Sequence, residues 1–261
     1  MKDLFGKALL DYQNGNYTED ILTSTSISDE DTLPLPYLFR DYKDMPKLEQ
    51  KALELCKGHV LDVGCGAGSH SLYLQKKGFQ VKAIDISRGA IEVAKQRGVL
   101  TTEVRALLDE TEPFNTILLL MNGTGIFQEL SKVSIYLLFL KRLLKPNGTL
   151  VIAVPNFKSY DAQYYKNYWA AYDVPRHLWH FSKTSISKLF HEEQLKLIDV
   201  LPMKFDAYYV SLLSEKYKSG VINPIKAFWI GWLSNLRGYR PKEYSSHIYI
   251  LKQDKIQYRQ P

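Results

Sequence analysis

A glycine-rich turn followed by an aspartate carries the clearest chemistry in this sequence. Residues 60–69 read Val-Leu-Asp-Val-Gly-Cys-Gly-Ala-Gly-Ser, an apolar run that ends in closely spaced glycines. Glycine lets the backbone turn sharply and lets a ligand approach closely. A second apolar run, 81–84, ends at Asp85, whose carboxylate is placed to accept hydrogen bonds from two ribose hydroxyls. Strand, glycine turn, helix, strand and acid together predict the nucleoside-binding half of a doubly wound α/β sheet.

The glycine spacing separates two kinds of nucleotide site. Dinucleotide-binding turns use G-x-G-x-x-G and place a pyrophosphate on the helix N-terminus. Here Gly64, Gly66 and Gly68 give G-x-G-x-G, so the third glycine comes one residue early. A nicotinamide or flavin site and a turn without any ligand are therefore the less expected alternatives.

The sequence around this turn resembles that of class I S-adenosylmethionine-dependent methyltransferases of the small-molecule type. The resemblance rests on 60–68, on Lys-Ala-Ile-Asp-Ile-Ser at 82–87 and on Leu-Leu-Lys-Pro-Asn-Gly-Thr-Leu-Val-Ile at 143–152. It implies S-adenosyl-L-methionine as the methyl donor, S-adenosyl-L-homocysteine as the product, and no metal. Residues from about 30 to 130 resemble one bacterial branch of the family, and residues from about 143 onward resemble a second.

The resemblance also assigns the donor contacts. Asp62 would face the donor's ammonium, directly or through water, with a turn-stabilising role as the alternative. Asp85 would hold the ribose, and Ile86 would cover one face of the adenine. Asp109 would meet the adenine amino group, with Glu103 as the other candidate. The expected donor contacts are Arg40, Asp62, Gly64, Cys65, Gly66, Gly68, Asp85, Ile86, Asp109, Met121 and Asn122.

Two histidines in 173–182 are the candidate catalytic residues. Pro175 favours an extended backbone before it, and a neutral His177 or His180 could take a proton from an oxygen or nitrogen nucleophile. A histidine that only hydrogen-bonds its own loop is the alternative. The strand expected at 116–121 is followed neither by the Asn-Pro-Pro-Tyr type of sequence nor by Pro-Cys, so methylation of nucleic-acid bases is not favoured.

The elements that must position these residues form one α/β domain with additions. The sequence predicts a Rossmann-like, doubly wound sheet of seven strands, and the resemblance places the last strand antiparallel between strands five and six. The strands are expected at 59–63, 80–85, 100–105, 116–121, 149–154, 195–203 and 246–252. Helices are expected at 45–56, 68–77, 88–97, 130–144 and 182–191, with two more inside 206–240.

Two insertions on the acceptor side complete this methyltransferase domain, which is expected to cover 45–261. Residues 156–181 place tyrosines 160, 164, 168 and 172 at a spacing of four, which lines one helix face. That face either packs on the sheet or forms a wall of the acceptor pocket. Residues 206–240 interrupt the fold between its last two strands and are expected to form a helical lid.

Residues 1–44 are expected to be a loop-like flap. The segment 24–31 is rich in Ser, Thr and Asp, and prolines follow it, which favours loop over packed structure. Tyr37, Phe39 and Arg40 precede the fold and are expected to close over the donor. Arg40 would pair with the donor carboxylate; a surface arginine is the alternative.

The charge of the chain is uneven. The net charge is +6, and residues 204–261 alone hold ten Lys/Arg and four Asp/Glu, again +6. An anionic partner such as RNA, a lipid surface or a phosphorylated substrate is one interpretation, and a solvated surface is the other. Two cysteines without metal or disulfide spacing fit a reducing cytosol. No apolar run reaches the length of a membrane span.

We therefore expect a cytoplasmic enzyme, monomeric or homodimeric, that moves the donor methyl to an O, N or C nucleophile of a small molecule by in-line attack. The alternatives are an RNA or protein methyltransferase that uses the basic C-terminal segment, and a donor-binding protein without turnover. Nucleic-acid partners and peripheral contact with a membrane are less expected. An apolar helix face at 225–233 leaves a lipid or quinone acceptor open.

The glycine spacing and Asp85 generate a direct binding test. The chain should bind S-adenosylmethionine and S-adenosylhomocysteine with micromolar affinity and should not bind NAD measurably, because G-x-G-x-G does not build a pyrophosphate site. Isothermal titration calorimetry with the three ligands measures this. Binding of NAD without binding of S-adenosylhomocysteine would refute the class of site.

Overall fold

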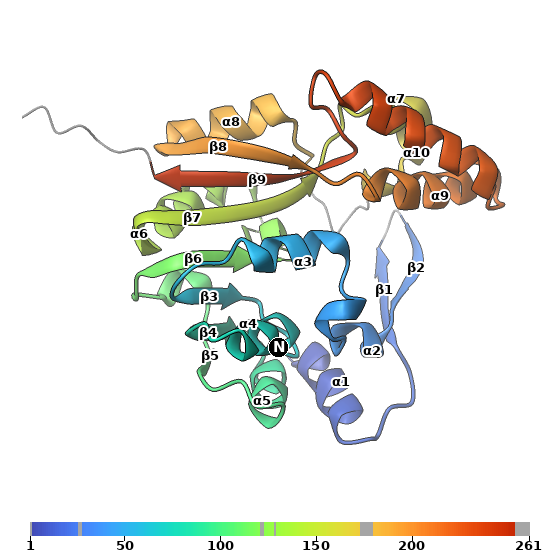
Figure 1. The fold of residues 1–261 in the computed structure, drawn as a ribbon. Helices are drawn as coiled ribbons and strands as arrows, with labels where there is room; N and C mark the ends of the chain where they lie inside the picture. Colours follow the sequence, from blue (N-terminus) through green and yellow to red (C-terminus); the bar gives the residue numbers. More distant parts are fainter. Residues whose placement is uncertain (1, 26–27, 121–122, 128, 173–179, 254–261) are drawn as a thin grey trace, which may run out of the picture. The chain divides into compact units, whose positions relative to one another are not determined.

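Figure 1 shows the fold of the computed structural model, which describes residues 2–25, 28–120, 123–127, 129–172 and 180–253. The chain forms two compact units. The first consists of Met1–Gly123 with Arg142–Gly148, and the second of Thr124–Lys141 with Thr149–Pro261.

Seven strands form a mixed sheet. They are β3 (Val60–Val63), β4 (Val81–Asp85), β5 (Thr102–Val104), β6 (Phe114–Leu119), β7 (Leu144–Pro155), β8 (Leu195–Pro202) and β9 (Ser246–Gln253). Their order is β5-β4-β3-β6-β7-β9-β8. β3 pairs in parallel with β4 and β6, whereas β9 pairs antiparallel with both β7 and β8. The predicted doubly wound sheet with an antiparallel last strand is confirmed.

The helices flank these strands (Figure 1). The α-helices are α1 (Leu4–Gln13), α2 (Leu35–Leu38), α3 (Lys47–Glu54), α4 (Ser69–Lys76), α5 (Arg88–Gln96), α6 (Val133–Leu143), α7 (Tyr160–Tyr165), α8 (Lys183–Glu192), α9 (Asp206–Ser219) and α10 (Pro224–Gly238). The 3-10 helices are η1 (Tyr42–Asp44), η2 (Leu107–Asp109), η3 (Gly123–Phe127), η4 (Leu130–Lys132), η5 (Lys166–Tyr168) and η6 (Ala170–Tyr172). The two helices predicted inside 206–240 are present as α9 and α10.

The central strands explain why part of the sequence reads as continuous apolar runs. In β3 every residue is buried, and in β6 all but one are. A parallel strand with helices on both faces has no solvent side, so its residues do not alternate. The carboxyl ends of β3 and β4 therefore emerge from a rigid, fully packed region.

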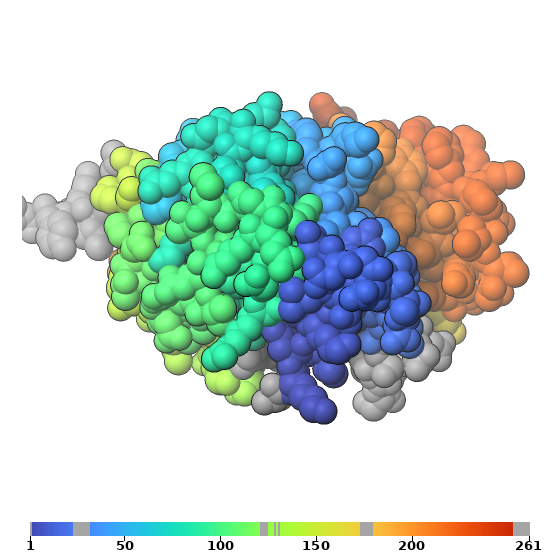
Figure 2. Space-filling view, turned by 90° about the horizontal axis from the view of Figure 1, so that it is seen from below, coloured from blue at the N-terminus to red at the C-terminus, as the bar shows by residue number. Residues whose placement is uncertain are grey.

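The loop predicted for residues 1–44 is wrong. This segment contains α1, the antiparallel hairpin of β1 (Ile21–Thr25) and β2 (Ser28–Leu33), and α2. Leu9 of α1 is fully buried in a cluster with Leu35, Leu38, Ala67 and Ala90. The polar composition of 24–31 misled the prediction because those residues form a hairpin. Figure 2 shows the N-terminal residues, in blue, as part of the packed surface of the first unit.

Helices α1 and α5 approach each other closely because each has a glycine at the contact. A Cβ at Gly89 would lie 2.4 Å from the backbone of Gly6. A Cβ at Gly6 would lie 2.4 Å from Asp3 Oδ2 and 2.5 Å from Ser87 Oγ. Any larger residue at either position would push the helices apart, so this packing depends on the absence of both side chains.

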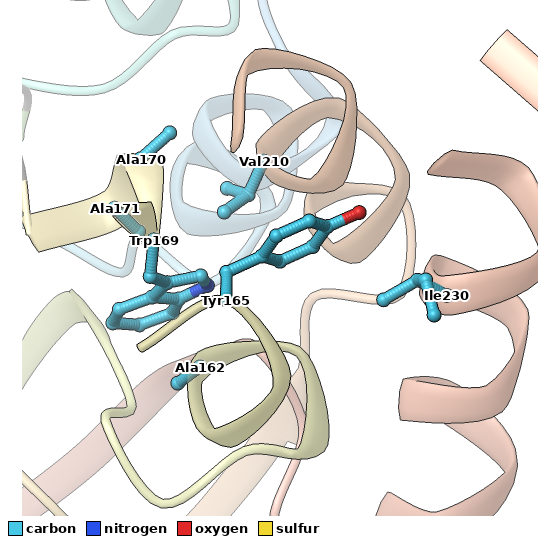
Figure 3. Packing of buried hydrophobic residues seen from close by; sticks show 7 residues of the cluster. All are labelled: Ala162, Tyr165, Trp169, Ala170, Ala171, Val210 and Ile230. Atoms are coloured by element: carbon cyan, nitrogen blue, oxygen red, sulfur yellow. The ribbon is translucent and has the colours of Figure 1, made fainter. Parts of the chain in front are cut away.

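In the second unit the tyrosines do not line one helix face. Helix α7 ends at Tyr165, and Lys166 has a positive φ of 52°, so the later tyrosines lie in η5 and η6. Tyr165 and Trp169 are buried against Val210 of α9 and Ile230 of α10 (Figure 3). Residues 160–172 of the aromatic-rich segment thus supply a core between helices.

A buried carboxylate ties this helical core together. Asp161 of α7 is fully buried and accepts hydrogen bonds from Trp169 Nε1 at 2.8 Å, Ser234 Oγ at 2.6 Å and Ser245 Oγ at 2.6 Å. A buried charge is tolerated when donors surround it in this way. The three donors join α7 to its own following turn, to α10 and to the approach to β9.

A second carboxylate, Asp206 at the start of α9, has a changed affinity for its proton. Burial raises the pKa of Asp206 to about 6, and the negative charge of Asp161 adds to this, while the Ser246 hydroxyl that donates to Asp206 opposes it. The folded chain therefore binds the proton more tightly than the unfolded chain, whose carboxyl keeps an ordinary pKa.

Replacing Asp206→Asn should remove a pH dependence of stability. With Asp206 present, the free energy of unfolding should fall as the pH rises from about 4 to about 6, because only the unfolded chain ionises freely there. Asparagine keeps an oxygen for Ser246 and should stabilise the protein by about 1–3 kcal/mol at pH 8. Chemical denaturation at several pH values measures this. The exposed Asp199→Asn is the control; an unchanged slope in Asp206→Asn would contradict the assignment.

Candidate functional site

Three glycines in left-handed conformation carry the chain from β3 into α4. The φ angles of Gly64, Gly66 and Gly68 are 70°, 52° and 78°. The turn is fastened to β4, because the N–H groups of Gly64 and Cys65 both donate to the Ile84 carbonyl, at 2.8 and 3.1 Å. The predicted turn is therefore present, and a side chain at any of the three glycines would strain the backbone.

The two later glycines serve different purposes. A Cβ at Gly68 would lie 2.8 Å from Val99 Cγ2, so this glycine allows α4 to start against the packed interior. A Cβ at Gly66 would meet only Phe5 Cζ, at 3.9 Å. Space beside Gly66 is therefore open, which suits a ligand that approaches the backbone.

Asp85 connects the glycine turn to the next helix. Its Oδ2 accepts a hydrogen bond from the N–H of Gly66 at 3.0 Å, and its Oδ1 accepts one from the N–H of Ser87 at 2.9 Å. Burial raises the pKa of Asp85, the two N–H groups oppose this, and the negative charges of Asp62 and Asp3 raise it further. Negative charges thus gather at this edge, and they would attract a positively charged ligand.

Asp62, at the end of β3, is buried and accepts a hydrogen bond from Ser71 Oγ at 2.6 Å. This contact supports the turn-stabilising role of Asp62. It involves Oδ2 of the carboxylate and not Oδ1. Cys65 is also buried, and burial together with Asp62 and Asp85 raises the pKa of its thiol far above the usual range. The thiol stays protonated, so Cys65 is no nucleophile.

The expected adenine contacts lie on the surface of the first unit. Ile86 is 76 % exposed, which is unusual for a large apolar side chain next to a buried strand. Asp109 ends η2 and is exposed, and its carbonyl accepts from Arg105 at 2.5 Å. Glu103 instead forms ion pairs with Arg105 and with Lys82, the latter at 3.3 Å. Glu103 is therefore already engaged, which favours Asp109.

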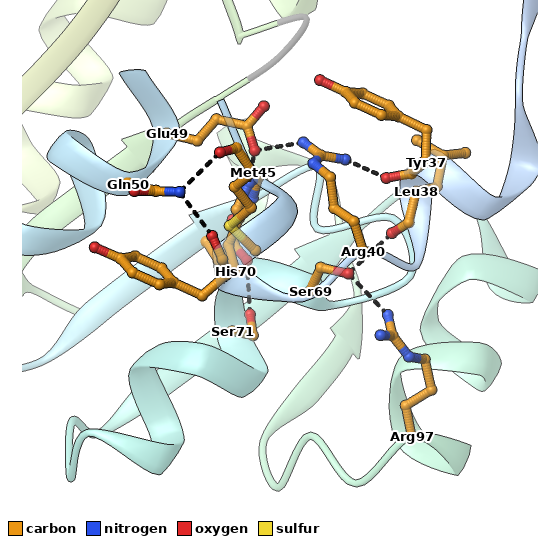
Figure 4. Close-up of polar contacts among 12 residues, drawn as sticks. Tyr37, Leu38, Arg40, Met45, Glu49, Gln50, Ser69, His70, Ser71 and Arg97 are labelled. Carbon is orange, nitrogen blue, oxygen red and sulfur yellow. Dashed lines mark hydrogen bonds and ion pairs between the residues drawn. The ribbon is translucent and has the colours of Figure 1, made fainter. Parts of the chain in front are cut away.

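Arg40 belongs to a buried ion-pair cluster. Its guanidinium donates to the Tyr37 carbonyl and to Glu49 of α3, and it lies 3.8 Å from the centroid of the Tyr37 ring. Glu49 also contacts His70 Nε2 at 2.8 Å, in the first turn of α4 (Figure 4). Arg40 is buried, so the alternative of a surface arginine is wrong.

Two further contacts join the N-terminal segment to the glycine turn. Ser69 Oγ donates to the Leu38 carbonyl at 2.9 Å. Arg97 donates to the carbonyls of Ala67 and Phe39, at 2.5 and 3.0 Å, and to Ser69 Oγ at 3.0 Å. We call Arg40, Glu49, Ser69, His70 and Arg97 the N-terminal clasp. Figure 4 shows the clasp between the N-terminal segment and α4.

Asp3 makes a similar connection at the start of α5. Its carboxylate accepts from the N–H of Gly6 at 2.8 Å, from the N–H of Gly89 at 3.0 Å and from Ser87 Oγ at 2.9 Å. Burial opposes ionisation, but these donors outweigh it and hold the pKa of Asp3 below its usual range. The Asp3 carboxylate therefore binds the N-terminal ends of both α1 and α5. The start of α5 follows directly after Asp85 and Ile86 in the chain.

Of the two candidate catalytic histidines, only His180 lies among the described residues. His180 Nε2 lies 2.9 Å from the Tyr172 carbonyl, and its ring meets the Tyr172 ring edge to face at 4.8 Å. Because a carbonyl only accepts, Nε2 carries the proton and Nδ1 keeps a lone pair when the ring is neutral. His177, Met121 and Asn122 lie outside the described residues.

The sequence reasoning missed the clasp and Asp3. Asp3 carried a signal, because it stands directly before the apolar pattern of α1 and could be read as an N-cap. Glu49, His70 and Arg97 carried none, since each is an ordinary polar residue on a helix or directly after one. Only the packing of α3, α4 and α5 in the first unit shows that they act together.

Comparisons with known proteins agree with this geometry. The model of a methyltransferase domain family matches residues 37–200, more than half of the chain. A ubiquinone biosynthesis O-methyltransferase of Rickettsia canadensis is 30% identical over 119 residues, which are 44% of this chain and 46% of that protein. The chain spans less than half the length of the curated relatives it matches.

Solved structures extend the likeness to nearly the whole chain. An S-adenosylmethionine-dependent methyltransferase from Bacteroides fragilis, in complex with S-adenosyl-L-homocysteine, is similar with a TM-score of 0.69 and 25% identity. The match covers 97% of this chain and 95% of that one. The [4+2]-cyclase SpnF matches with a TM-score of 0.53 at 15% identity, over 97% and 94% of the two chains, which shows the fold alone.

Glu49→Gln should weaken the first unit. Burial opposes ionisation of Glu49, but His70 and Arg40 outweigh it and hold its pKa below the usual range. Removing the charge leaves a buried guanidinium poorly paired, which should cost about 3 kcal/mol of stability. The loss should be present at neutral pH and should shrink as the pH falls and Glu49 of the parent protein takes up a proton. Urea unfolding at pH 7 and pH 4 measures it.

The same helix offers a matched control. Glu54 forms an exposed ion pair with Lys51 at 3.0 Å, so Glu54→Gln should leave stability nearly unchanged. Equal losses in the two variants would show that the clasp contributes no more than a surface pair.

Proposed function

Because the chain belongs to the methyltransferase domain family, we propose that it transfers the methyl group of S-adenosylmethionine to an oxygen nucleophile of a small organic molecule. The observation that carries this proposal is Asp85 at the end of β4, joined by hydrogen bonds to Gly66 and to Ser87. Several of the curated relatives are named as O-methyltransferases, which supports oxygen as the acceptor atom.

The residues of the first unit fit this donor by charge and by space. Asp85 has lone pairs left for two ribose hydroxyls after it has accepted from Gly66 and Ser87. Asp62 offers a carboxylate to the donor's ammonium, and open space beside Gly66 admits the donor chain. Carboxylates would repel the pyrophosphate of a dinucleotide but attract the positive donor, so the charge of the site favours the proposed ligand.

Adenine recognition is the next part of the proposal. Exposed Ile86 offers an apolar face for the adenine ring, and Asp109 is placed to accept from its amino group. The loss of exposed apolar surface at Ile86 on binding would contribute a hydrophobic term. Asp109 contributes selectivity, since its oxygens only accept and adenine donates there.

We assign the N-terminal segment a positioning role around the donor. The clasp holds residues 37–40 against the first turn of α4, and Asp3 holds α1 against the start of α5. Arg40 acts through Glu49 and His70, because its guanidinium is already bound to Glu49 and Tyr37. The flap expected from the sequence is thus proposed as an ordered cover.

The bound donor supplies an electrophilic methyl group on a positively charged sulfur. The protein's contribution is then to hold donor and acceptor in line and to exclude water, which lowers the entropic part of the barrier. His180 is the candidate general base among the described residues, through the lone pair on Nδ1. Incubation with labelled donor and a panel of phenols, amines and carbon acids tests the acceptor class.

The second candidate function is binding of the donor without methyl transfer. The cyclase SpnF shares this fold, so the fold by itself does not determine the reaction. Methylated product and an equal amount of S-adenosylhomocysteine would support the enzyme. Tight donor binding with no product from any oxygen acceptor would favour the second function.

Asp85→Ala should weaken donor binding at least about tenfold. The change removes charge-assisted hydrogen bonds to the ribose, each on the order of 1.5–3 kcal/mol before compensation. It also leaves the N–H groups of Gly66 and Ser87 without their acceptor, so thermal stability must be measured alongside binding. Calorimetry with S-adenosylhomocysteine, below the melting temperature of the variant, gives the dissociation constant.

Asp44→Ala is the matched control for this experiment. Asp44 is an exposed aspartate of the same unit and should leave the dissociation constant unchanged. An Asp85→Ala variant that is folded and binds as tightly as the parent protein would place the ribose elsewhere.

A further inference from the structure

Helix α10 of the second unit is apolar on both sides. Its buried side consists of Ala227, Ile230, Gly231, Ser234 and Gly238. Its outer side carries Ile225, which is 75 % exposed, with Phe228 and Trp229, each 53 % exposed, and then Trp232 and Leu236. A surface helix normally places polar residues on its solvent side. The exposed apolar side chains on the outer side of α10 are therefore expected to contact a partner.

The exposed side chains form one continuous surface. On α10 they recur every three or four residues, which aligns them along one helix face. The Phe228 and Trp229 rings lie 6.0 Å apart, and the Trp229 and Trp232 rings lie 5.6 Å apart, edge to face in both cases. We call this set the aromatic ridge; its members are Phe205, Tyr209, Ile225, Phe228, Trp229, Trp232 and Leu236.

Helix α9 continues the ridge. α9 and α10 lie side by side (Figure 1), and a Cβ at Gly231 would lie 2.8 Å from Tyr208 Cδ1, which shows how closely they pack. Between them, Phe205, Tyr209 and Phe228 line a hollow of about 490 Å³. The ridge is therefore an apolar surface with a recess large enough for part of a hydrocarbon chain.

Positive charge borders the ridge without any negative charge in the same stretch. Residues 216–242 contain six basic residues and no Asp or Glu. Lys226 pairs with Glu215 at 3.0 Å, and Arg237 lies 4.2 Å from the centroid of the Tyr160 ring. Lys216, in the last turn of α9, and Arg240, just after α10, are exposed. The margin of the ridge is thus suited to an anionic surface.

We propose that the aromatic ridge docks the protein on an anionic lipid surface. Trp, Phe and Ile would enter the boundary between headgroups and acyl chains, while Lys216 and Arg240 would meet acidic headgroups. No helix among the described residues is long and apolar enough to cross a membrane, so α10 would lie along the surface. From the sequence alone, peripheral membrane contact is less expected. The exposed ridge, in contrast, favours it.

Two other partners fit the ridge less well. Nucleic acid would stack on the aromatic rings, but Ile225 and Leu236 offer nothing to a base and are as exposed as the rings. A second copy of the chain in a two-fold contact would bring the same basic margin against itself, because such a contact uses one patch on both copies. A lipid surface uses the apolar side chains and the basic margin at the same time.

The test is sedimentation with vesicles of defined composition, using the full chain. The parent protein should bind vesicles of phosphatidylcholine and phosphatidylglycerol at least about tenfold more tightly than vesicles of phosphatidylcholine alone, and added salt should weaken this preference. Trp229→Ser with Trp232→Ser should reduce binding at least about tenfold. Lys216→Gln with Arg240→Gln should remove most of the preference for the acidic lipid.

A second apolar pair provides the matched control. Ile135 and Leu138 are 57 % and 52 % exposed on α6, so Ile135→Ser with Leu138→Ser removes a comparable apolar area away from the ridge. This control variant should bind vesicles as the parent protein does. Circular dichroism confirms that the variants are folded.

Quenching by brominated lipids gives a second reading. The tryptophan fluorescence of the parent protein should be quenched, and Trp229→Ser with Trp232→Ser should lose most of this quenching, because Trp169 is buried. Equal vesicle binding by the ridge and control variants, or no quenching, would overturn the proposal. Loss of RNA binding or of self-association in the ridge variant, with no lipid binding by the parent, would also overturn it. The docking does not depend on the proposed methyl transfer, so its failure would leave that function intact.

Discussion

One carboxylate organises the donor side of this protein. Asp85 accepts from the N–H of Gly66 with one oxygen and from the N–H of Ser87 with the other. It thereby connects the turn after β3 with the helix after β4, and without it the partly buried N–H of Gly66 would lose its acceptor. Burial and the negative charges of Asp62 and Asp3 raise the pKa of Asp85. A positively charged ligand would offset this repulsion between carboxylates and would be bound more tightly for that reason.

The N-terminal segment is built onto this arrangement. Asp3 binds Ser87 and Gly89 immediately after the ribose loop, and the clasp binds the first turn of α4 through Glu49 and Ser69. The first turns of α4 and α5 therefore depend on residues that precede β3 in the chain, among them Asp3, Leu38 and Glu49. Donor binding and the packing of α1 are expected to be coupled for this reason.

The second unit follows a different design. Its core is formed by helices around Tyr165 and Trp169, with Asp161 as a fully satisfied polar centre, while the outer side of α10 remains apolar. This core does not include the ridge, and an exposed apolar patch of this kind is typical of an interaction site, which is the basis of the proposed lipid docking. Membership of the methyltransferase domain family accounts for the glycine turn and Asp85 in the first unit. It does not account for the aromatic ridge of the second unit.

The sequence by itself determined the sheet, the glycine turn and Asp85, because parallel strands and left-handed glycines leave local patterns of apolar runs and spacing. Only the tertiary structure decided the N-terminal segment, the clasp and the path of the tyrosines after Tyr165. Those features depend on contacts between residues far apart in the chain, such as Arg40 with Glu49 and Gly6 with Gly89, and no local pattern records which distant side chain a residue will meet.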